Sequence, residues 1–126
     1  MTVVITGAGS GIGRCIAQTL AEKGFSLFLL GRSLDNLETT KKMLKNPEQH
    51  QCQSCDIRDP EEIHRALANV SSLYGLIANA GIGGENQYGE ADRWREIIDT
   101  NLTGTYQTVQ ECLPLIKKNP APFKKI

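Results

Sequence analysis

Residues 2–14, TVVITGAGSGIGR, join a short apolar run to a glycine-rich turn and then to the opening of an amphipathic segment. This order predicts a strand, a tight turn and a helix, because glycine lacks the Cβ atom that would block such a turn. The first N–H groups of a helix have no partner within it and lie at the positive end of its dipole. The stretch therefore predicts a phosphate-binding surface.

The glycine spacing departs from the common dinucleotide pattern G-x-G-x-x-G, because Arg14 stands where the last glycine would be. The loop reads T-G-x-x-x-G-x-G instead, from Thr6 through Gly7, Gly11 and Gly13. A glycine turn without a ligand is the alternative. The position of the loop between a predicted strand and a predicted helix favours phosphate binding.

Length and charge narrow the class of protein. A chain of 126 residues suits one small domain with a core. Its formal net charge of +0 gives no electrostatic reason to bind nucleic acid or an anionic membrane. We see no basic leader and no apolar run of membrane-spanning length, so we expect a cytoplasmic enzyme.

The four cysteines do not predict a metal or redox site. Cys15 and Cys112 fall at helix positions that we expect to face the core. Cys52 and Cys55 form a C-x-x-C, but a zinc site needs two more ligands at matching spacing. A redox C-x-x-C belongs at a helix N-terminus, whereas this pair falls in or at the end of a predicted strand. We expect no metal.

Apolar periodicity and turn signals predict four strand–helix units. The strands are expected at 2–6, 25–30, 50–55 and 74–79. The first helix is expected at 12–23, and the second begins after an N-cap at Ser33 and runs to about 46. The third begins at 60, after a capping box formed by Asp59 and Glu62. The fourth runs from 91 or 92 to the prolines at 120 and 122. Ile12 and Leu34 are among the apolar residues expected to face inward.

Repeated strand–helix alternation predicts an α/β fold with a doubly wound parallel sheet, in the spatial order 3-2-1-4. Ligands of such sheets bind beyond the C-terminal strand ends where the order reverses, here between strands one and four. Four loops, at 7–13, 31–32, 56–57 and 79–81, fall at those ends. The last residues, 124–126, suggest the beginning of a fifth strand that is cut short.

Four short motifs follow one another along the chain: TGAGSGIGR at 6–14, CDIRD at 55–59, ANAG at 78–81 and NLTG at 101–104. In sequence and order they resemble the motifs of the short-chain dehydrogenase/reductase family. The resemblance implies a Rossmann-type NAD(P)-binding domain over residues 1–126, truncated before strand five, from a family of oxidoreductases that are usually dimers or tetramers. Ala78 departs from the family pattern, which more often has asparagine there.

The resemblance also implies roles for individual residues. Thr6 would brace the loop, the backbone near Ser10 would meet phosphate and ribose, and Asp56 would flank the adenine. The structural alternatives are a turn cap for Thr6, a helix-entry residue for Asp56 and a loop-fixing hydrogen bonder for Asn79. The cofactor-binding set, apart from Arg32, is Gly7, Gly9, Ser10, Gly11, Ile12, Gly13, Asp56, Ile57, Asn79, Ala80 and Gly81.

The residue that follows strand two bears on the choice of cofactor. An NAD enzyme places a carboxylate there for the ribose 2′-hydroxyl, whereas a 2′-phosphate calls for a cation. Gly31 and Arg32 follow Leu30, with no acid. A guanidinium can hold phosphate through two hydrogen bonds, so we expect Arg32 to bind and NADP to be preferred over NAD, which is the alternative if Arg32 is merely solvated. Arg14 is expected on the helix face rather than on phosphate.

Asn101 is the one candidate catalytic residue. Asparagine is a poor helix former, so its position inside a predicted helix indicates a role other than helix formation. The family motif implies that it holds a water near the catalytic lysine. An exposed asparagine after Thr100 is the alternative.

The family's reaction transfers a hydride between the nicotinamide and a small carbonyl or alcohol substrate, with a serine, a tyrosine and a lysine four residues after it. Tyr74, Tyr88 and Tyr106 are followed at that spacing by alanine, aspartate and glutamine. We therefore expect cofactor binding without turnover. A fragment of a longer dehydrogenase is favoured over a truncated product, a non-catalytic sensor or an interaction module. The expected partners are the substrate and further copies of the chain, without nucleic acid or membrane.

Overall fold

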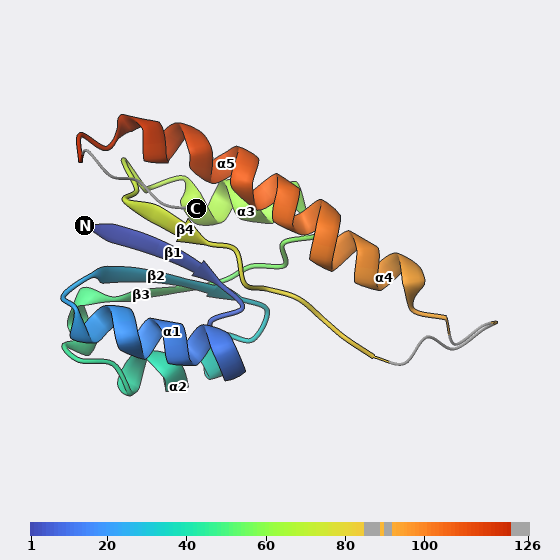
Figure 1. Ribbon diagram of the computed structural model, residues 1–126, viewed down its shortest axis with the longest axis horizontal. Helices are drawn as coiled ribbons and strands as arrows, with labels where there is room; N and C mark the ends of the chain where they lie inside the picture. The colour runs from blue at the N-terminus through green and yellow to red at the C-terminus, as the bar shows by residue number, and fades with distance from the viewer. Residues whose placement is uncertain (85–88, 90–91, 122–126) are drawn as a thin grey trace.

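The computed structural model describes residues 1–84, 89 and 92–121. Four parallel strands form one sheet in the order β3-β2-β1-β4, which confirms the predicted topology (Figure 1). In the centre of the sheet Val3 pairs with Leu27 on one side and with Gly75 on the other. The strands are β1 (Thr2–Thr6), β2 (Ser26–Gly31), β3 (Gln51–Ser54) and β4 (Gly75–Ile77).

Helices cover both faces of this sheet. Helices α1 and α2 lie on one face, and α3 and α5 lie on the other, while α4 continues the line of α5 beyond the sheet (Figure 1). The helices are α1 (Gly11–Glu22), α2 (Leu34–Lys42), α3 (Pro60–Leu67), α4 (Trp94–Ile98) and α5 (Thr105–Lys118). Helix α2 ends at Lys42, earlier than predicted, and is followed by left-handed Asn46 at φ 53° and a 3₁₀ turn, Pro47–Gln49.

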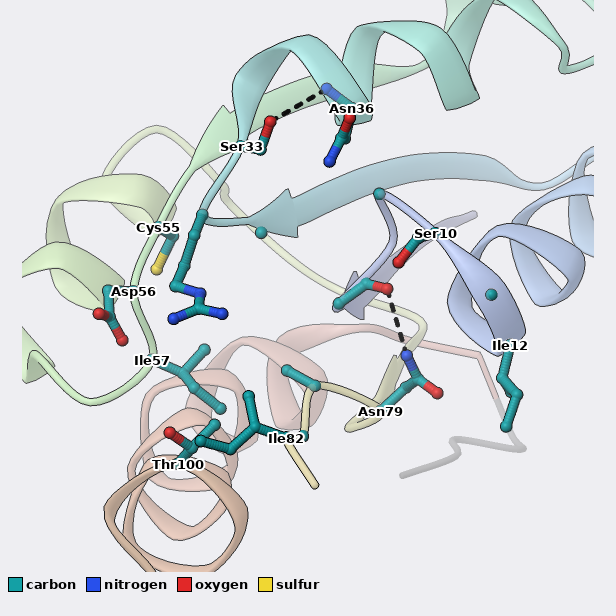
Figure 2. A pocket seen from close by; sticks show the side chains of 17 residues that line it. Ser10, Ile12, Ser33, Asn36, Cys55, Asp56, Ile57, Asn79, Ile82 and Thr100 are labelled. Atoms are coloured by element: carbon teal, nitrogen blue, oxygen red, sulfur yellow. Dashed lines mark hydrogen bonds between the residues drawn. The ribbon is translucent and has the colours of Figure 1, made fainter. Parts of the chain in front are cut away.

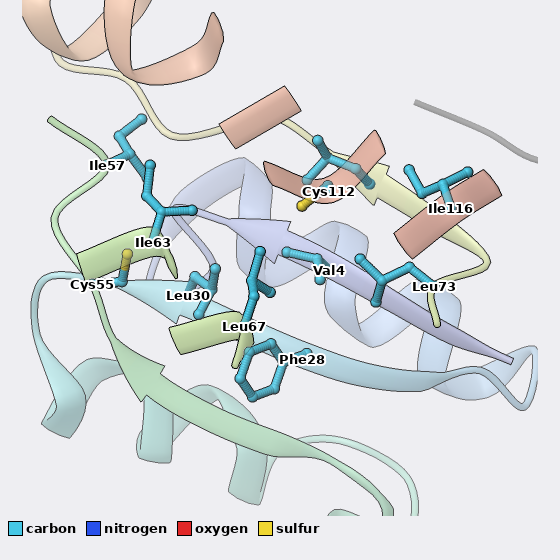
Figure 3. Packing of buried hydrophobic residues seen from close by; sticks show 11 residues of the cluster. Val4, Phe28, Leu30, Cys55, Ile57, Ile63, Leu67, Leu73, Cys112 and Ile116 are labelled. Atoms are coloured by element: carbon cyan, nitrogen blue, oxygen red, sulfur yellow. The ribbon is translucent and has the colours of Figure 1, made fainter. Parts of the chain in front are cut away.

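The core is divided by the sheet into two clusters. Phe28 and Leu30 of β2 belong to the cluster under α3 and α5, which Figure 3 shows. Leu27 and Leu29, which alternate with them, belong to the cluster under α1 and α2. Both faces of β2 are thus buried, as its unbroken apolar run predicts. Strand β3 is largely exposed and forms the polar edge.

The start of α3 differs from the predicted capping box in one hydrogen bond. Asp59 caps the helix as expected, since its carboxylate accepts from the N–H of Glu61 at 2.9 Å. Glu62 does not bond back to Asp59. Its carboxylate accepts instead from the N–H of Asp56 at 2.7 Å. The acid predicted to close the cap therefore holds the preceding loop.

Three predicted inward positions are wrong. The side chains of Ile12 and Leu34 are 73% and 46% exposed, and Cys15 is exposed. Helix α1 instead turns its small residues to the sheet, and Gly13, Ala17 and Ala21 are buried. Small residues let the helix backbone approach the strands closely, which leaves the larger side chains on the outer face.

The long predicted helix is interrupted. A π-helical segment, Asp99–Gly104, separates α4 from α5. At its end a Cβ on Gly104 would lie 2.9 Å from the carbonyl oxygen of Ile57, so glycine permits this close contact. No helix in the described part of the chain is both long and apolar enough to span a bilayer. The predicted helix start at 91, its end at Pro122 and the strand at 124–126 lie outside the described residues.

Candidate functional site

A cleft of about 690 Å³ opens where the C-terminal ends of the strands meet (Figure 2). It receives residues from the glycine loop after β1 and from the segments that follow β2, β3 and β4. This is the crevice predicted from the topology, between the two strands at which the order reverses. It is lined by Gly7, Gly9, Ser10, Gly11, Ile12, Gly31, Arg32, Ser33, Asn36, Cys55, Asp56, Ile57, Asn79, Ala80, Gly81, Ile82 and Thr100.

The glycine loop is packed behind and open in front. A Cβ on Gly13 would lie 2.2 Å from the carbonyl oxygen of Gly7, and one on Gly7 would lie 2.8 Å from Cα of Ala80. Gly11, at φ +50°, has nothing within 4 Å of its Cβ position. Ser10 precedes α1 without a side-chain cap in the described chain, which leaves the first N–H groups of the helix uncapped, and Ser10, Gly11 and Ile12 line the cleft. The loop fits a phosphate group.

A side-chain hydroxyl ties β1 to the segment after β4. Thr6 is buried, and its Oγ1 accepts from the N–H groups of Asn79 and Ala80, each at 3.0 Å. The amide of Asn79 donates in return to the carbonyl oxygens of Thr6 at 3.1 Å and Gly7 at 3.3 Å, the second of which is drawn in Figure 2. These contacts match the bracing role implied for Thr6 and the loop-fixing alternative for Asn79.

Asp56 lies at the wall of the cleft that follows β3. Its carboxylate accepts from Nη2 of Arg58 at 2.6 Å and from Nε at 3.0 Å. The hydrogen bond from the Arg58 side chain is the main reason that the pKa of Asp56 lies below its usual value, and Arg32 lowers it further. Asp56 is therefore ionised and oriented before any ligand arrives.

Arg32 follows the last residue of β2 and is exposed at the cleft. Its backbone is fixed by the hydroxyl of Ser54, which donates to the Arg32 carbonyl oxygen at 3.0 Å. Within the described residues its guanidinium makes no hydrogen bond or ion pair. Asp56 is the one acid among the described lining residues, and it is paired with Arg58. This part of the cleft therefore offers a cation to a ligand.

Asn101 lies behind the cleft lining and holds a loop. Its Oδ1 accepts from the N–H of Ile82 at 2.8 Å, and its Nδ2 donates to the carbonyl oxygen of Ile82 at 2.8 Å. The neighbouring Thr100 is the residue of this segment that lines the cleft. The side chain of Asn101 thus positions the residues after β4.

The cleft gathers most of the residues expected to bind cofactor. Gly13 alone of that set is absent from the described lining, because it packs behind the loop. Five further residues with side chains were not among the candidates, namely Ser33, Asn36, Cys55, Ile82 and Thr100. The first two could have been found, because the helix cap at Ser33 places the start of α2 beside Arg32.

The C-x-x-C pair is divided between the two faces of the sheet. Cys55 packs in the cluster under α3 and α5, whereas Cys52 packs against the cluster under α1 and α2. Burial raises the pKa of each thiol from 9.0 to about 11. No group of three or more potential metal ligands occurs among the described residues.

A parallel sheet in this order, with an uncapped helix and an open glycine turn at its switch point, defines a protein of the Rossmann class. The family model described as short chain dehydrogenase matches residues 1–121. The chain therefore belongs to the short-chain dehydrogenase family of oxidoreductases.

Known relatives and structures agree with this assignment. A sulfoacetaldehyde reductase from Chromohalobacter salexigens is 34% identical over 121 residues, which are 90% of this chain and 48% of the relative. An alcohol dehydrogenase from Thermococcus sibiricus, complexed with 5-hydroxy-NADP, superposes with a TM-score of 0.82 at 32% identity, over 93% of this chain and 53% of the other.

An actinorhodin polyketide ketoreductase with NADPH has a TM-score of 0.80 at 34% identity, over 89% of this chain and 46% of that protein. The chain spans about half the length of the curated relatives that it matches.

Proposed function

We propose that residues 1–126 are the cofactor-binding half of an NADP-preferring oxidoreductase, which transfers a hydride between the nicotinamide and a small carbonyl or alcohol substrate. The observation that carries the preference is the position of Arg32, a cation without a hydrogen-bonding partner in the described chain, at the end of β2. A guanidinium suits a 2′-phosphate. At the end of β2 the described lining residues include no acid that could accept from a 2′-hydroxyl instead.

Different walls of the cleft would bind different parts of the cofactor. The glycine loop, from Gly7 to Gly13, would hold the diphosphate on the uncapped start of α1. Asp56 and Ile57 would flank the adenine, and Asn79 to Gly81 would line the opposite face. When bound, the nicotinamide supplies or accepts the hydride. Asn101 would keep the segment after β4 in place through Ile82.

Two of the similar solved structures support the choice of cofactor. The ketoreductase structure is described with NADPH and the alcohol dehydrogenase structure with 5-hydroxy-NADP, and both share the fold of this chain. We further propose that the whole protein works as a homo-oligomer in the cytoplasm. The exposed apolar side chains of Trp94 in α4, Leu102 in the π-helical segment and Tyr106 in α5 support a protein partner for this face.

The proposed preference is tested by titrating the full chain with NADPH and NADH and following nicotinamide fluorescence. We expect NADPH to bind more tightly, and Arg32→Glu to reverse the order, because a carboxylate repels the 2′-phosphate and can accept from a 2′-hydroxyl. Arg95→Glu, a charge reversal on exposed α4 away from the lining, is the matched control. Equal or tighter binding of NADH by the unaltered chain would refute the role of Arg32.

A non-catalytic nucleotide sensor is the second candidate. It is favoured by the absence of a tyrosine followed four residues later by lysine anywhere in the 126 residues. Either way, we expect this chain to bind cofactor without turnover. Carbonyl-dependent oxidation of NADPH by the purified chain, above the rate without protein, would contradict that expectation.

A further inference from the structure

The glycine loop is joined to α2 by a pair of side chains that do not line the cleft. Arg14 extends from the first turns of α1, and its Nε donates to Oγ1 of Thr40 at 2.9 Å. Its Nη2 donates to the carbonyl oxygen of Gly9 in the loop. Thr40 is fully buried in α2, and its Oγ1 lies 2.9 Å from the carbonyl oxygen of Ala8. We name Arg14 and Thr40 together the loop strut.

The hydrogen bonds of the loop strut form without a ligand. The Thr40 hydroxyl has one proton, which it can give to the carbonyl oxygen of Ala8, or to that of Asn36 at 3.1 Å. Its lone pairs remain to accept from Arg14. Arg14 donates through Nε to Thr40 and through Nη2 to Gly9, and these two bonds hold its guanidinium against the loop backbone.

The strut connects two separate walls of the cleft. The loop carries the backbone N–H groups of Ser10, Gly11 and Ile12 to one wall, whereas Ser33 and Asn36, at the start of α2, form another wall beside Arg32. Gly9 of the loop lies close to the start of α2, since a Cβ on Gly9 would lie 3.0 Å from Cβ of Asn36. The Arg14–Thr40 contact links the loop to α2 at a second place.

We infer that Arg14 and Thr40 are positioning residues, which fix the distance between the diphosphate site and the adenosine 2′-phosphate site. The inference rests on the proposed function, because it needs a ligand that spans both walls. A dinucleotide must satisfy both sites at once, so an error in their separation weakens its binding. A ligand that occupies one wall is indifferent to that separation.

Two ligands and three variants test the strut in the full chain. NADPH spans both walls, whereas adenosine 2′-phosphate occupies the Arg32 wall. Thr40→Val removes the hydroxyl, Arg14→Lys keeps the charge without the fork of donors, and Arg14→Gln removes the charge. We expect each variant to lower the affinity for NADPH about ten-fold. The affinity for adenosine 2′-phosphate should stay within about two-fold of that of the unaltered chain.

The double variant that combines Arg14→Gln with Thr40→Val should bind NADPH about as tightly as the more weakly binding of the two single variants. The two effects do not add, because both changes break the same link. Thr40→Ser keeps the hydroxyl and should retain NADPH affinity, which also separates the hydrogen bond from the packing if the valine variant fails to fold.

Matched controls come from α2 and from α3. Thr39 is exposed in α2 and makes the same type of bond within its helix, to Asp35 at 2.9 Å, without touching the loop, so Thr39→Val should leave NADPH affinity unchanged. Arg65→Gln, in α3, is the arginine control. NADPH affinity that is unchanged in the strut variants, or that falls in parallel with adenosine 2′-phosphate affinity, would overturn the inference. Failure of the unaltered chain to bind either ligand would instead refute the proposed function.

Discussion

The amide of Asn101 and the backbone of Ile82 form a closed pair of hydrogen bonds, both 2.8 Å long. Asparagine can make this pair because its side chain carries one acceptor and one donor on neighbouring atoms. The π-helical segment Asp99–Gly104 thereby holds the segment that leaves β4. The relationship links a helix irregularity, a common feature of functional sites, to one wall of the cleft.

Replacing Asn101 by aspartate should destabilise the folded chain more than is usual for a substitution at an exposed position. One carboxylate oxygen can still accept from the N–H of Ile82, but the other faces the Ile82 carbonyl oxygen without a proton. We expect a loss of about 1–2 kcal/mol in the free energy of unfolding at pH 7, measured by urea denaturation. Asn69→Asp, at an exposed position, is the control. Equal stability of Asn101→Asp and the unaltered chain would show that the pair contributes little.

Thr6→Val should have a larger effect, although the two side chains have nearly the same shape. The buried valine would leave the N–H groups of Asn79 and Ala80 without their acceptor. We expect a loss of about 2 kcal/mol or more, together with weaker NADPH binding. Thr6→Ser restores the hydroxyl and should recover most of both quantities. If the valine variant were as stable as the serine variant and bound NADPH equally well, packing alone would account for the role of Thr6.

Alanine substitutions at two glycines of the loop should separate steric exclusion from backbone conformation. Gly13→Ala places a methyl group 2.2 Å from the carbonyl oxygen of Gly7, a contact that backbone must move to relieve. We expect a loss of about 3 kcal/mol or more from thermal or urea unfolding. Gly11→Ala meets open space and should cost about 1 kcal/mol through its φ of +50°. The reverse ranking would show that the loop is packed differently.

The buried thiols predict how stability depends on alkaline pH. Burial raises the pKa of Cys55 from 9.0 to about 11 and that of Cys112 from 9.0 to about 12. Between these values the folded chain keeps protons that the unfolded chain has lost, so the free energy of unfolding should fall as pH rises above about 9. Urea titrations at pH 8 and pH 10 measure the difference.

Iodoacetamide labelling at pH 8, read by mass spectrometry, gives a second measure of the same burial. Exposed Cys15 should react first, and Cys55 and Cys112 should react when urea unfolds the chain. Rapid labelling of Cys112 without urea would contradict the packing of α5.

The architecture could be predicted from the sequence because its signals are local. The apolar run 25–30 indicated a strand buried on both faces, and Ser33 and Asp59 marked the two helix starts that the structure shows. Repetition of the strand–helix unit then determined the sheet order. The cleft followed from that order, since parallel strands bring the ends of their loops to one edge.

Contacts between distant side chains could not be predicted in this way. Arg14 looked like a helix-face residue, but it bonds to Thr40, which is 26 positions away. Glu62 has the spacing of a capping box, yet Asp56 offers its N–H to the same carboxylate. Ile12 matched an inward periodicity that the close packing of Gly13 on Gly7 overrides. In each case the outcome depends on which groups the tertiary fold brings near.

The pairing of β1 with β4 has a consequence for the time course of synthesis. Thr6 accepts a hydrogen bond from Asn79, which emerges from the ribosome 73 residues later. Strands β1 and β2 can pair long before, because Thr2 and Ser26 are close in sequence. The cleft is therefore completed late in translation, and a nascent chain that has not reached Asn79 lacks one of the walls that support its glycine turn.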